Sequence, residues 1–81
     1  MNEYKLIFFG WLSEQTGCRE TNWKSDAGNC RDLLNELIAH YKLDDEKTRH
    51  FNVAINDDYA SMDSAIHSGD LVVFIPPVAG G

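Results

Sequence analysis

Hydrophobic and polar positions follow two different periods along the chain, and the change of period predicts its elements. In residues 30–41, apolar residues recur at three- and four-residue intervals: Cys30, Leu33, Leu34, Leu37, Ile38 and Tyr41. This spacing forms one stripe of an amphipathic helix, which needs a sheet to lie on. Asn29 is a favourable N-cap for it, and Asp32 suits the positive end of the helix dipole. The solvent side is predicted to carry Arg31, Asp32, Asn35 and Glu36.

Residues 4–9 predict the first strand, because they form a short apolar and aromatic run. Successive side chains of a strand face opposite ways, so Ile7 and Phe9 should point away from Tyr4, Leu6 and Phe8. A sheet with one covered face normally shows apolar residues on that face alone. Ile7 and Phe9 are therefore a candidate exposed apolar patch.

The remaining strands are shorter or more polar. Residues 10–17 predict a connection with a helical turn at 12–14, and residues 18–24 predict a hairpin partner at or near an edge. Residues 51–56 alternate, with Phe51, Val53 and Ile55 inward. A turn at residues 57 and 58 then leads to a short return strand at 59 and 60. The last strand, residues 70–75, should place Val72 and Phe74 opposite to Val73 and Ile75.

Two stretches lack a period. Residues 43–50 predict a charged connection, and residues 61–69 an irregular segment in which Met62 and Ile66 plug the core. One amphipathic helix on a mixed sheet of about five strands is an α+β architecture. The domain is predicted to span residues 1–75, and an extended C-terminal tail residues 76–81.

Net charge and composition argue against several classes of function. Thirteen acidic and seven basic residues give a formal charge of −6, which argues against a nucleic-acid partner. The negative charge either favours binding to basic surfaces of partner proteins or only aids solubility. No stretch predicts a membrane span or a secretory signal, so we expect a cytoplasmic protein without a membrane partner.

Candidate metal or nucleophilic chemistry is sparse. Cys18 and Cys30 are too few for a disulfide scaffold; Cys30 falls on the buried helix stripe, and Cys18 near a turn is a candidate reactive thiol. His40, His50 and His67 are spread without metal-ligand spacing, so we expect no metal and no permanently bound cofactor.

The C-terminal segment has the composition of a chain end that is threaded into another protein: Pro76, Pro77, Val78, Ala79, Gly80 and Gly81. Proline cannot donate to a sheet ladder, so the strand should stop at Pro76, and the Pro-Pro pair favours an extended path. Glycine has no Cβ, so a partner's backbone can close around Gly80 and Gly81. The chemically distinct group is the Gly81 carboxylate. The ordinary alternative is a frayed end without function.

Three stretches resemble the small subunits of molybdopterin synthase, a family of ubiquitin-like β-grasp sulfur carriers. These are residues 5–17 with Lys-Leu-Ile-Phe-Phe and Glu-Gln-Thr-Gly, residues 53–56 with Val-Ala-Ile-Asn, and residues 69–81 with Gly-Asp at the start and Pro-Pro-Val-Ala-Gly-Gly at the end. The resemblance implies that an adenylyltransferase of the ubiquitin-activating type uses ATP to adenylate Gly81. Sulfur then replaces the adenylate to give a thiocarboxylate.

The same resemblance implies where the sulfur goes. The large synthase subunit would take the tail into its active site, in a heterotetramer of two small and two large subunits, and form the dithiolene of molybdopterin on cyclic pyranopterin monophosphate. The catalytic groups would belong to that partner. Phe9, Tyr59 and Ile75 are predicted to contact it, with Tyr59 at an apolar position that the family uses there. Two alternatives remain: a thiazole sulfur carrier for thiamine, and a ubiquitin-like modifier or interaction module without sulfur transfer.

Overall fold

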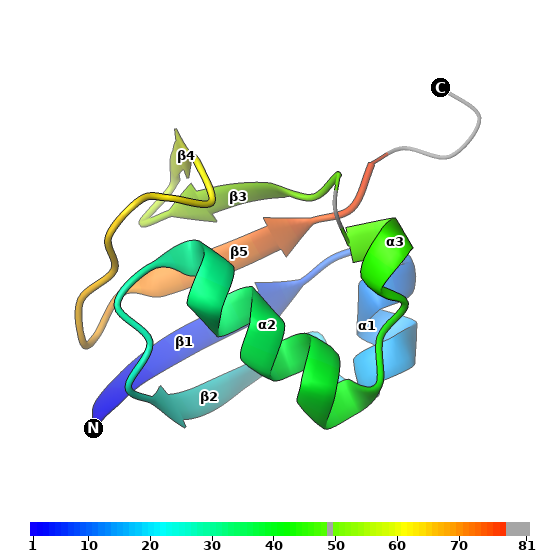
Figure 1. Cartoon of the computed structure of the whole chain (residues 1–81), viewed down its shortest axis with the longest axis horizontal. Helices are drawn as coiled ribbons and strands as arrows, with labels where there is room; N and C mark the ends of the chain where they lie inside the picture. The colour runs from blue at the N-terminus through cyan, green and yellow to red at the C-terminus, as the bar shows by residue number, and fades with distance from the viewer. Residues whose placement is uncertain (49, 78–81) are drawn as a thin grey trace.

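The structure, a computed structural model, describes residues 1–48 and 50–77, except for the side chains of residues 45 and 47 (Figure 1). Its elements follow in the order β1 (Asn2–Phe8), α1 (Trp11–Thr16), β2 (Glu20–Ser25), α2 (Cys30–Tyr41), α3 (Asp45–Thr48), β3 (Asn52–Ile55), β4 (Asp58–Ala60) and β5 (Leu71–Ile75). The predicted order of strands and main helix is confirmed, and the strand bounds differ from the prediction by at most two residues.

The strands form one mixed sheet in the order β2-β1-β5-β3-β4. β1 and β5, from opposite ends of the chain, are parallel neighbours with Phe8 opposite Phe74, and the other neighbouring pairs are antiparallel. The predicted edge position of β2 is confirmed. Because β5 lies in the middle of the sheet, the segment after it leaves from an inner strand rather than from an edge.

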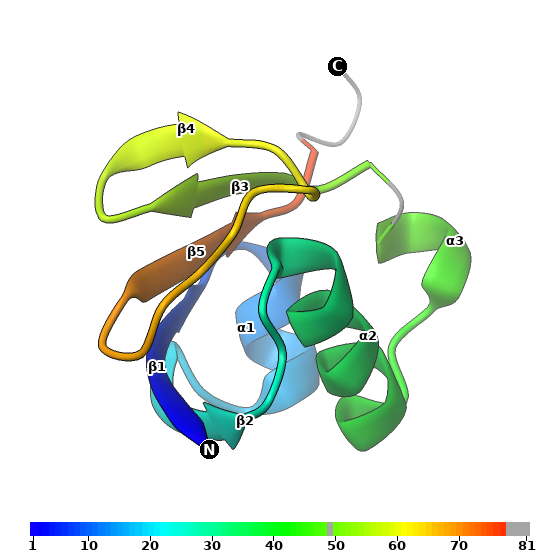
Figure 2. The ribbon, with the colours of Figure 1, turned by 60° about the vertical axis from the view of Figure 1, so that its left-hand side comes forward.

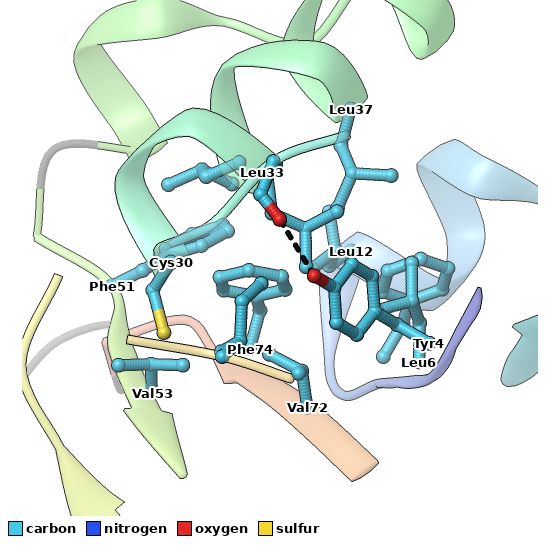
Figure 3. Close-up of a cluster of buried hydrophobic side chains, with 14 of the residues drawn as sticks. Tyr4, Leu6, Leu12, Cys30, Leu33, Leu37, Phe51, Val53, Val72 and Phe74 are labelled. Carbon is cyan, nitrogen blue, oxygen red and sulfur yellow. Dashed lines mark hydrogen bonds between the residues drawn. The ribbon is translucent and has the colours of Figure 1, made fainter. Parts of the chain in front are cut away.

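The core fills the space between this sheet and α2 (Figure 3). Tyr4, Leu6 and Phe8 of β1 are at most 2% exposed, and Val72 and Phe74 of β5 are fully buried. The buried Tyr4 hydroxyl donates a 2.6 Å hydrogen bond to the Ala27 carbonyl oxygen, so its polar atom has a partner. The predicted inward faces of both strands are therefore confirmed.

The main helix begins and packs largely as its sequence predicts. The Asn29 side-chain oxygen accepts a 2.8 Å hydrogen bond from the Asp32 N–H, as expected for an N-cap. Along the stripe, the buried side chains are Cys30, Leu33, Leu34 and Leu37. Burial raises the pKa of the Cys30 thiol, with a smaller contribution from the Asp70 charge, so Cys30 stays a neutral core residue.

The predicted solvent position of Glu36 is wrong. Its carboxylate is half-buried and accepts hydrogen bonds from the Trp23 indole N–H at 3.1 Å and the Ser25 hydroxyl at 2.7 Å. Glu36 lies at the border of the apolar stripe, where the two donors on β2 can reach it. It therefore ties α2 to the edge strand.

The connection over residues 43–50, for which the sequence predicts only a charged connection, contains a short helix, α3. Asp44 accepts hydrogen bonds from the Glu46 N–H through its side chain, at 2.9 Å, and from the Thr48 N–H through its carbonyl, at 3.1 Å. An aspartate before a run of acidic residues is an N-terminal helix signal that the sequence did contain. Leu43 and Thr48 are buried, so this segment packs against the domain.

The turn between β3 and β4 fixes the start of β5. It is centred on Asn56 and Asp57, at φ of 52° and 75°, one residue earlier than predicted. The Asn56 side chain accepts from the Leu71 N–H and donates to the Asp70 carboxylate, both at 3.0 Å. Hydrogen bonds from the His67 N–H first, and from Asn56 second, lower the pKa of Asp70, so the charged form is favoured at this junction.

Candidate functional site

The tail begins at the end of the sheet that lies opposite to the N-terminus (Figure 1). β5 ends at Ile75, as predicted from Pro76. Pro76 is buried and Pro77 is exposed, so the packing of the domain extends one residue beyond the strand. The predicted tail residues Val78, Ala79, Gly80 and Gly81 lie outside the described residues.

A tight turn after β1 supports Pro76, the first residue of the tail, which we call the tail root. The Leu12 N–H donates to the Phe9 carbonyl at 3.2 Å, which places Gly10 at the second position of a four-residue turn. Gly10 has φ 58° and ψ −139°, close to the conformation that a type II′ turn requires there and that glycine adopts most readily. A Cβ at Gly10 would lie 3.3 Å from Cγ of Pro76. Close packing between the turn and Pro76 therefore sets where the tail leaves the domain.

A second apolar pair borders the same root. Trp11, the first residue of α1, packs on Phe51, with ring centroids 5.5 Å apart. Phe51 directly precedes β3, whose first residue, Asn52, pairs with Ile75. The short helix α1 replaces the single helical turn that the sequence predicted at residues 12–14. The tail thus leaves the domain beside the turn after β1, near the start of α1 and the segment just before β3.

The helices cover one face of the sheet and leave the other open (Figure 2). On the open face, Ile7 lies opposite Val73, Val73 opposite Ala54, and Ala54 opposite Tyr59. Phe9 follows β1 beside Ile75, since Phe8 is paired with Phe74. We call these residues the open-face patch: Ile7, Phe9, Ala54, Tyr59, Val73 and Ile75.

The open-face patch contains the exposed aromatic side chains that the sequence singled out. Phe9 is 51% exposed and Tyr59 is 83% exposed, while Ile75 is half-buried. The outward direction of Phe9 is confirmed; its contact with a partner, like those of Tyr59 and Ile75, stays a prediction. Ala54 and Val73 were not proposed for the site, although strand alternation could have placed them there. Large exposed aromatics on one face are typical of protein-binding surfaces.

Other candidate chemistry is weak. Cys18 is half-buried, and its Sγ lies 3.9 Å from the Thr16 hydroxyl oxygen. The His40 ring packs edge-on against Trp23, with centroids 5.0 Å apart. Among residues 1–48 and 50–77, no group of His, Cys, Asp and Glu side chains could hold a metal ion. No helix in this described part is long and apolar enough to cross a membrane.

A match to a known family covers both the end of the chain and the open-face patch. The model of the ThiS family matches residues 6–81, a range that includes both the β5 strand and the segment from Pro76 to Gly81. The chain belongs to the ThiS family. The family match spans all of the chain except its first five residues.

Two relatives align over almost their whole length. The molybdopterin synthase sulfur carrier subunit of Chlamydomonas reinhardtii is 29% identical, and the match covers 98% of this chain and 99% of that protein. The small archaeal modifier protein 3 of Haloferax volcanii is 33% identical, with 98% and 99% covered. The family resemblance seen in the sequence is therefore confirmed.

Solved structures confirm the fold. SAMP1 from Haloferax volcanii has a TM-score of 0.81 and 26% identity, with 99% of this chain and 100% of that chain covered. A chain from the complex of subunits 1 and 2 of the molybdopterin-converting factor of Helicobacter pylori 26695 has a TM-score of 0.66 and 25% identity. The match covers 98% of this chain and 99% of that chain. The ubiquitin-like β-grasp architecture predicted from the sequence is the observed one.

Proposed function

We propose that this chain is the sulfur carrier of molybdopterin synthesis. The observation that carries the proposal is the similarity to a molybdopterin synthase sulfur carrier subunit over 98% of this chain, and the family match includes the segment ending in Gly-Gly. A second relative with the same description, from Arabidopsis thaliana, is 26% identical over 98% of this chain. The packed tail root and the exposed apolar face supply the structural features that a carrier needs.

The reacting group in this proposal is the Gly81 carboxylate. A carboxylate is a poor electrophile, so an ATP-dependent adenylyltransferase converts it to an acyl-adenylate and releases pyrophosphate. A sulfide equivalent then attacks the Gly81 carbonyl carbon, and AMP leaves. The product is a thiocarboxylate, whose sulfur is negatively charged at neutral pH and can attack an electrophilic carbon.

The acceptor in the proposal is cyclic pyranopterin monophosphate, held by the large synthase subunit. The thiocarboxylate sulfur bonds to a carbon of the acceptor as an oxygen substituent leaves that carbon, and water then cleaves the bond between that sulfur and the Gly81 carbonyl carbon. Gly81 returns as a carboxylate. A dithiolene contains two sulfurs, so each product molecule consumes two loaded carriers. This stoichiometry suits an assembly of two small and two large subunits.

The domain contributes reach and orientation to this chemistry. Five residues after the buried Pro76 span roughly 16 Å in polyproline geometry, at about 3.1 Å per residue. This length suits an acceptor site that lies below the partner's surface. The open-face patch is proposed to dock on the large subunit while the packed turn at Gly10 directs the tail. Catalytic side chains are assigned to the partner enzymes.

A complex of related subunits supports this partner. The structure from Helicobacter pylori 26695 is described as a complex of subunits 1 and 2 of the molybdopterin-converting factor, and the matched chain has 25% identity to this one. The subunit that corresponds to subunit 2 is the partner that we propose for the open-face patch.

A second candidate function is protein modification. The similarity to small archaeal modifier protein 3 covers 98% of this chain at 33% identity, slightly above the identity to the algal carrier. In this alternative, the activated Gly81 carbonyl carbon would bond to a lysine amine of a target protein and AMP would leave. The two functions share adenylation and differ in the nucleophile that follows.

Reconstitution tests the proposal. The chain is combined with the large subunit of its source organism, the activating enzyme, ATP, a sulfide donor and cyclic pyranopterin monophosphate. We expect molybdopterin to form, with two thiocarboxylates consumed for each product molecule. Omission of the large subunit is the control and should leave the loaded carrier intact. Loaded carrier that never yields molybdopterin, with Gly81 joined to lysines instead, would favour the modifier function.

A further inference from the structure

A hollow of about 550 Å³ lies beside the open-face patch at the end of β1. Its apolar part comes from Ile7, Phe8 and Phe9 together with Gly10. Its polar rim comes from two elements, with Ser13 and Glu14 on α1 and Arg19 just before β2. The volume falls within the usual range for small-molecule pockets, about 300–1,000 Å³.

The hollow is continuous with both parts of the proposed carrier site. Phe9 belongs to the hollow and to the open-face patch, and Gly10 belongs to the hollow and packs against Pro76 at the tail root. A protein that covers the patch and surrounds the tail must therefore also cover the hollow. If the hollow stayed empty under the partner, its lining would lose packing contacts, so a complementary interface fills it.

The rim carries two charged side chains without internal partners. Two basic residues elsewhere on the surface do have partners. Nζ of Lys5 lies 3.9 Å from Oε2 of Glu20, and Nη2 of Arg31 lies 2.7 Å from Oδ1 of Asp63. In contrast, neither the Arg19 guanidinium nor the Glu14 carboxylate has a hydrogen bond or ion pair in the described part of the chain. A partner that covers these groups would leave each one desolvated unless it supplied an opposite charge.

We infer that the hollow is a specificity pocket for a protruding segment of the large synthase subunit. The segment inserts an apolar side chain against Ile7 and Phe9, pairs a carboxylate with Arg19 and places a cationic or N–H donor beside Glu14. The large subunit is the occupant because the hollow adjoins the surface and the tail that it is proposed to engage. This inference therefore rests on the proposed function.

The charge pattern gives the pocket its selectivity. The chain has a formal charge of −6, so a basic partner surface is attracted to most of the domain. A carboxylate opposite Arg19 is attracted there, whereas the acidic residues, which outnumber the basic ones on this molecule, repel it elsewhere. The pocket would thus fix how the partner is docked, which in turn aims the tail.

A charge-reversal pair tests the inference by calorimetric titration with the large subunit. Arg19→Glu should weaken binding at least tenfold, because it puts a like charge opposite the partner's carboxylate. Lys24→Glu is the matched control: Lys24 is an exposed cation on β2 that does not line the hollow, and its reversal should change affinity less than about twofold. Thermal melts of both variants should match the wild type.

A second pair tests whether the hollow is filled. Ser13→Trp places an indole in the hollow and should reduce affinity more than tenfold, whereas Gln15→Trp, on the exposed side of the same helix, should not. Equal effects within each pair would overturn the pocket. Tighter binding by Arg19→Glu would also overturn it.

These binding experiments distinguish failure of the proposed pocket from failure of the proposed function. Wild-type chain that binds the large subunit and loads sulfur on Gly81, together with Arg19→Glu behaving like Lys24→Glu, would reject the pocket alone. Wild-type chain that neither binds the large subunit nor loads sulfur would reject the proposed function itself.

Discussion

Deletion of Gly81 should abolish sulfur transfer and leave the domain as stable as before. The shortened chain ends in Gly80, so its carboxylate sits about 3.1 Å short of the proposed reacting position in an extended tail. Near-attack geometry tolerates much smaller errors, and a displacement of about 1 Å can cost a factor of about one hundred in rate. Loss of one terminal residue generally changes the stability of a domain little, so the melting temperature should not change.

The measurement combines a molybdopterin assay with a thermal melt of the same protein. A chain extended beyond Gly81 by a short tag is the companion variant, because it masks the carboxylate without shortening the tail. It should fail as completely as the deletion. Substantial transfer by either variant would remove Gly81 from the mechanism, and a lowered melt would show that the last residue contributes to the fold.

Phe9→Ala should weaken binding to the large subunit by more than about tenfold, since a central aromatic anchor typically contributes about 2 kcal/mol or more to an interface. The isolated domain should remain folded, because the side chain is 51% exposed and lies outside the core. Calorimetric titration measures the affinity, and a thermal melt on the same preparation measures the stability.

The neighbouring residue provides a matched control for this prediction. Phe8 is 2% exposed and packs in the core, so Phe8→Ala should lower the free energy of unfolding by about 3–5 kcal/mol. Two adjacent phenylalanines should thus give opposite results, with lost affinity at Phe9 and lost stability at Phe8. Unchanged affinity of Phe9→Ala would remove the open-face patch from the proposed interface.

The sequence predicts the sheet and the main helix because their apolar positions repeat with a clear period. Alternation from Tyr4 to Phe9 was enough to separate a core face from an open face, and both are observed. Alternation along β3 and β5 likewise indicates that Ala54 and Val73 face away from the core. They join the patch only once the register places them between Ile7 and Tyr59, and register depends on pairing between distant segments.

Local polar contacts were harder to predict. Glu36 has a polar side chain on a helix, and only the position of Trp23 and Ser25 on β2 makes it a half-buried acceptor. The contact between Gly10 and Pro76 joins residues far apart in the sequence, so no period indicates it. Likewise, the hollow exists because α1, β1 and the approach to β2 converge, which the sequence does not reveal.

The intact mass of the chain isolated from its own cells tests the sulfur-carrier function most directly. We expect a population that ends at Gly81 and is heavier than the unmodified chain by the difference between one sulfur and one oxygen atom. Loss of the activating enzyme should remove this population. A chain that is found only as the free carboxylate, or with Gly81 joined to lysines of other proteins, would contradict the sulfur-carrier function.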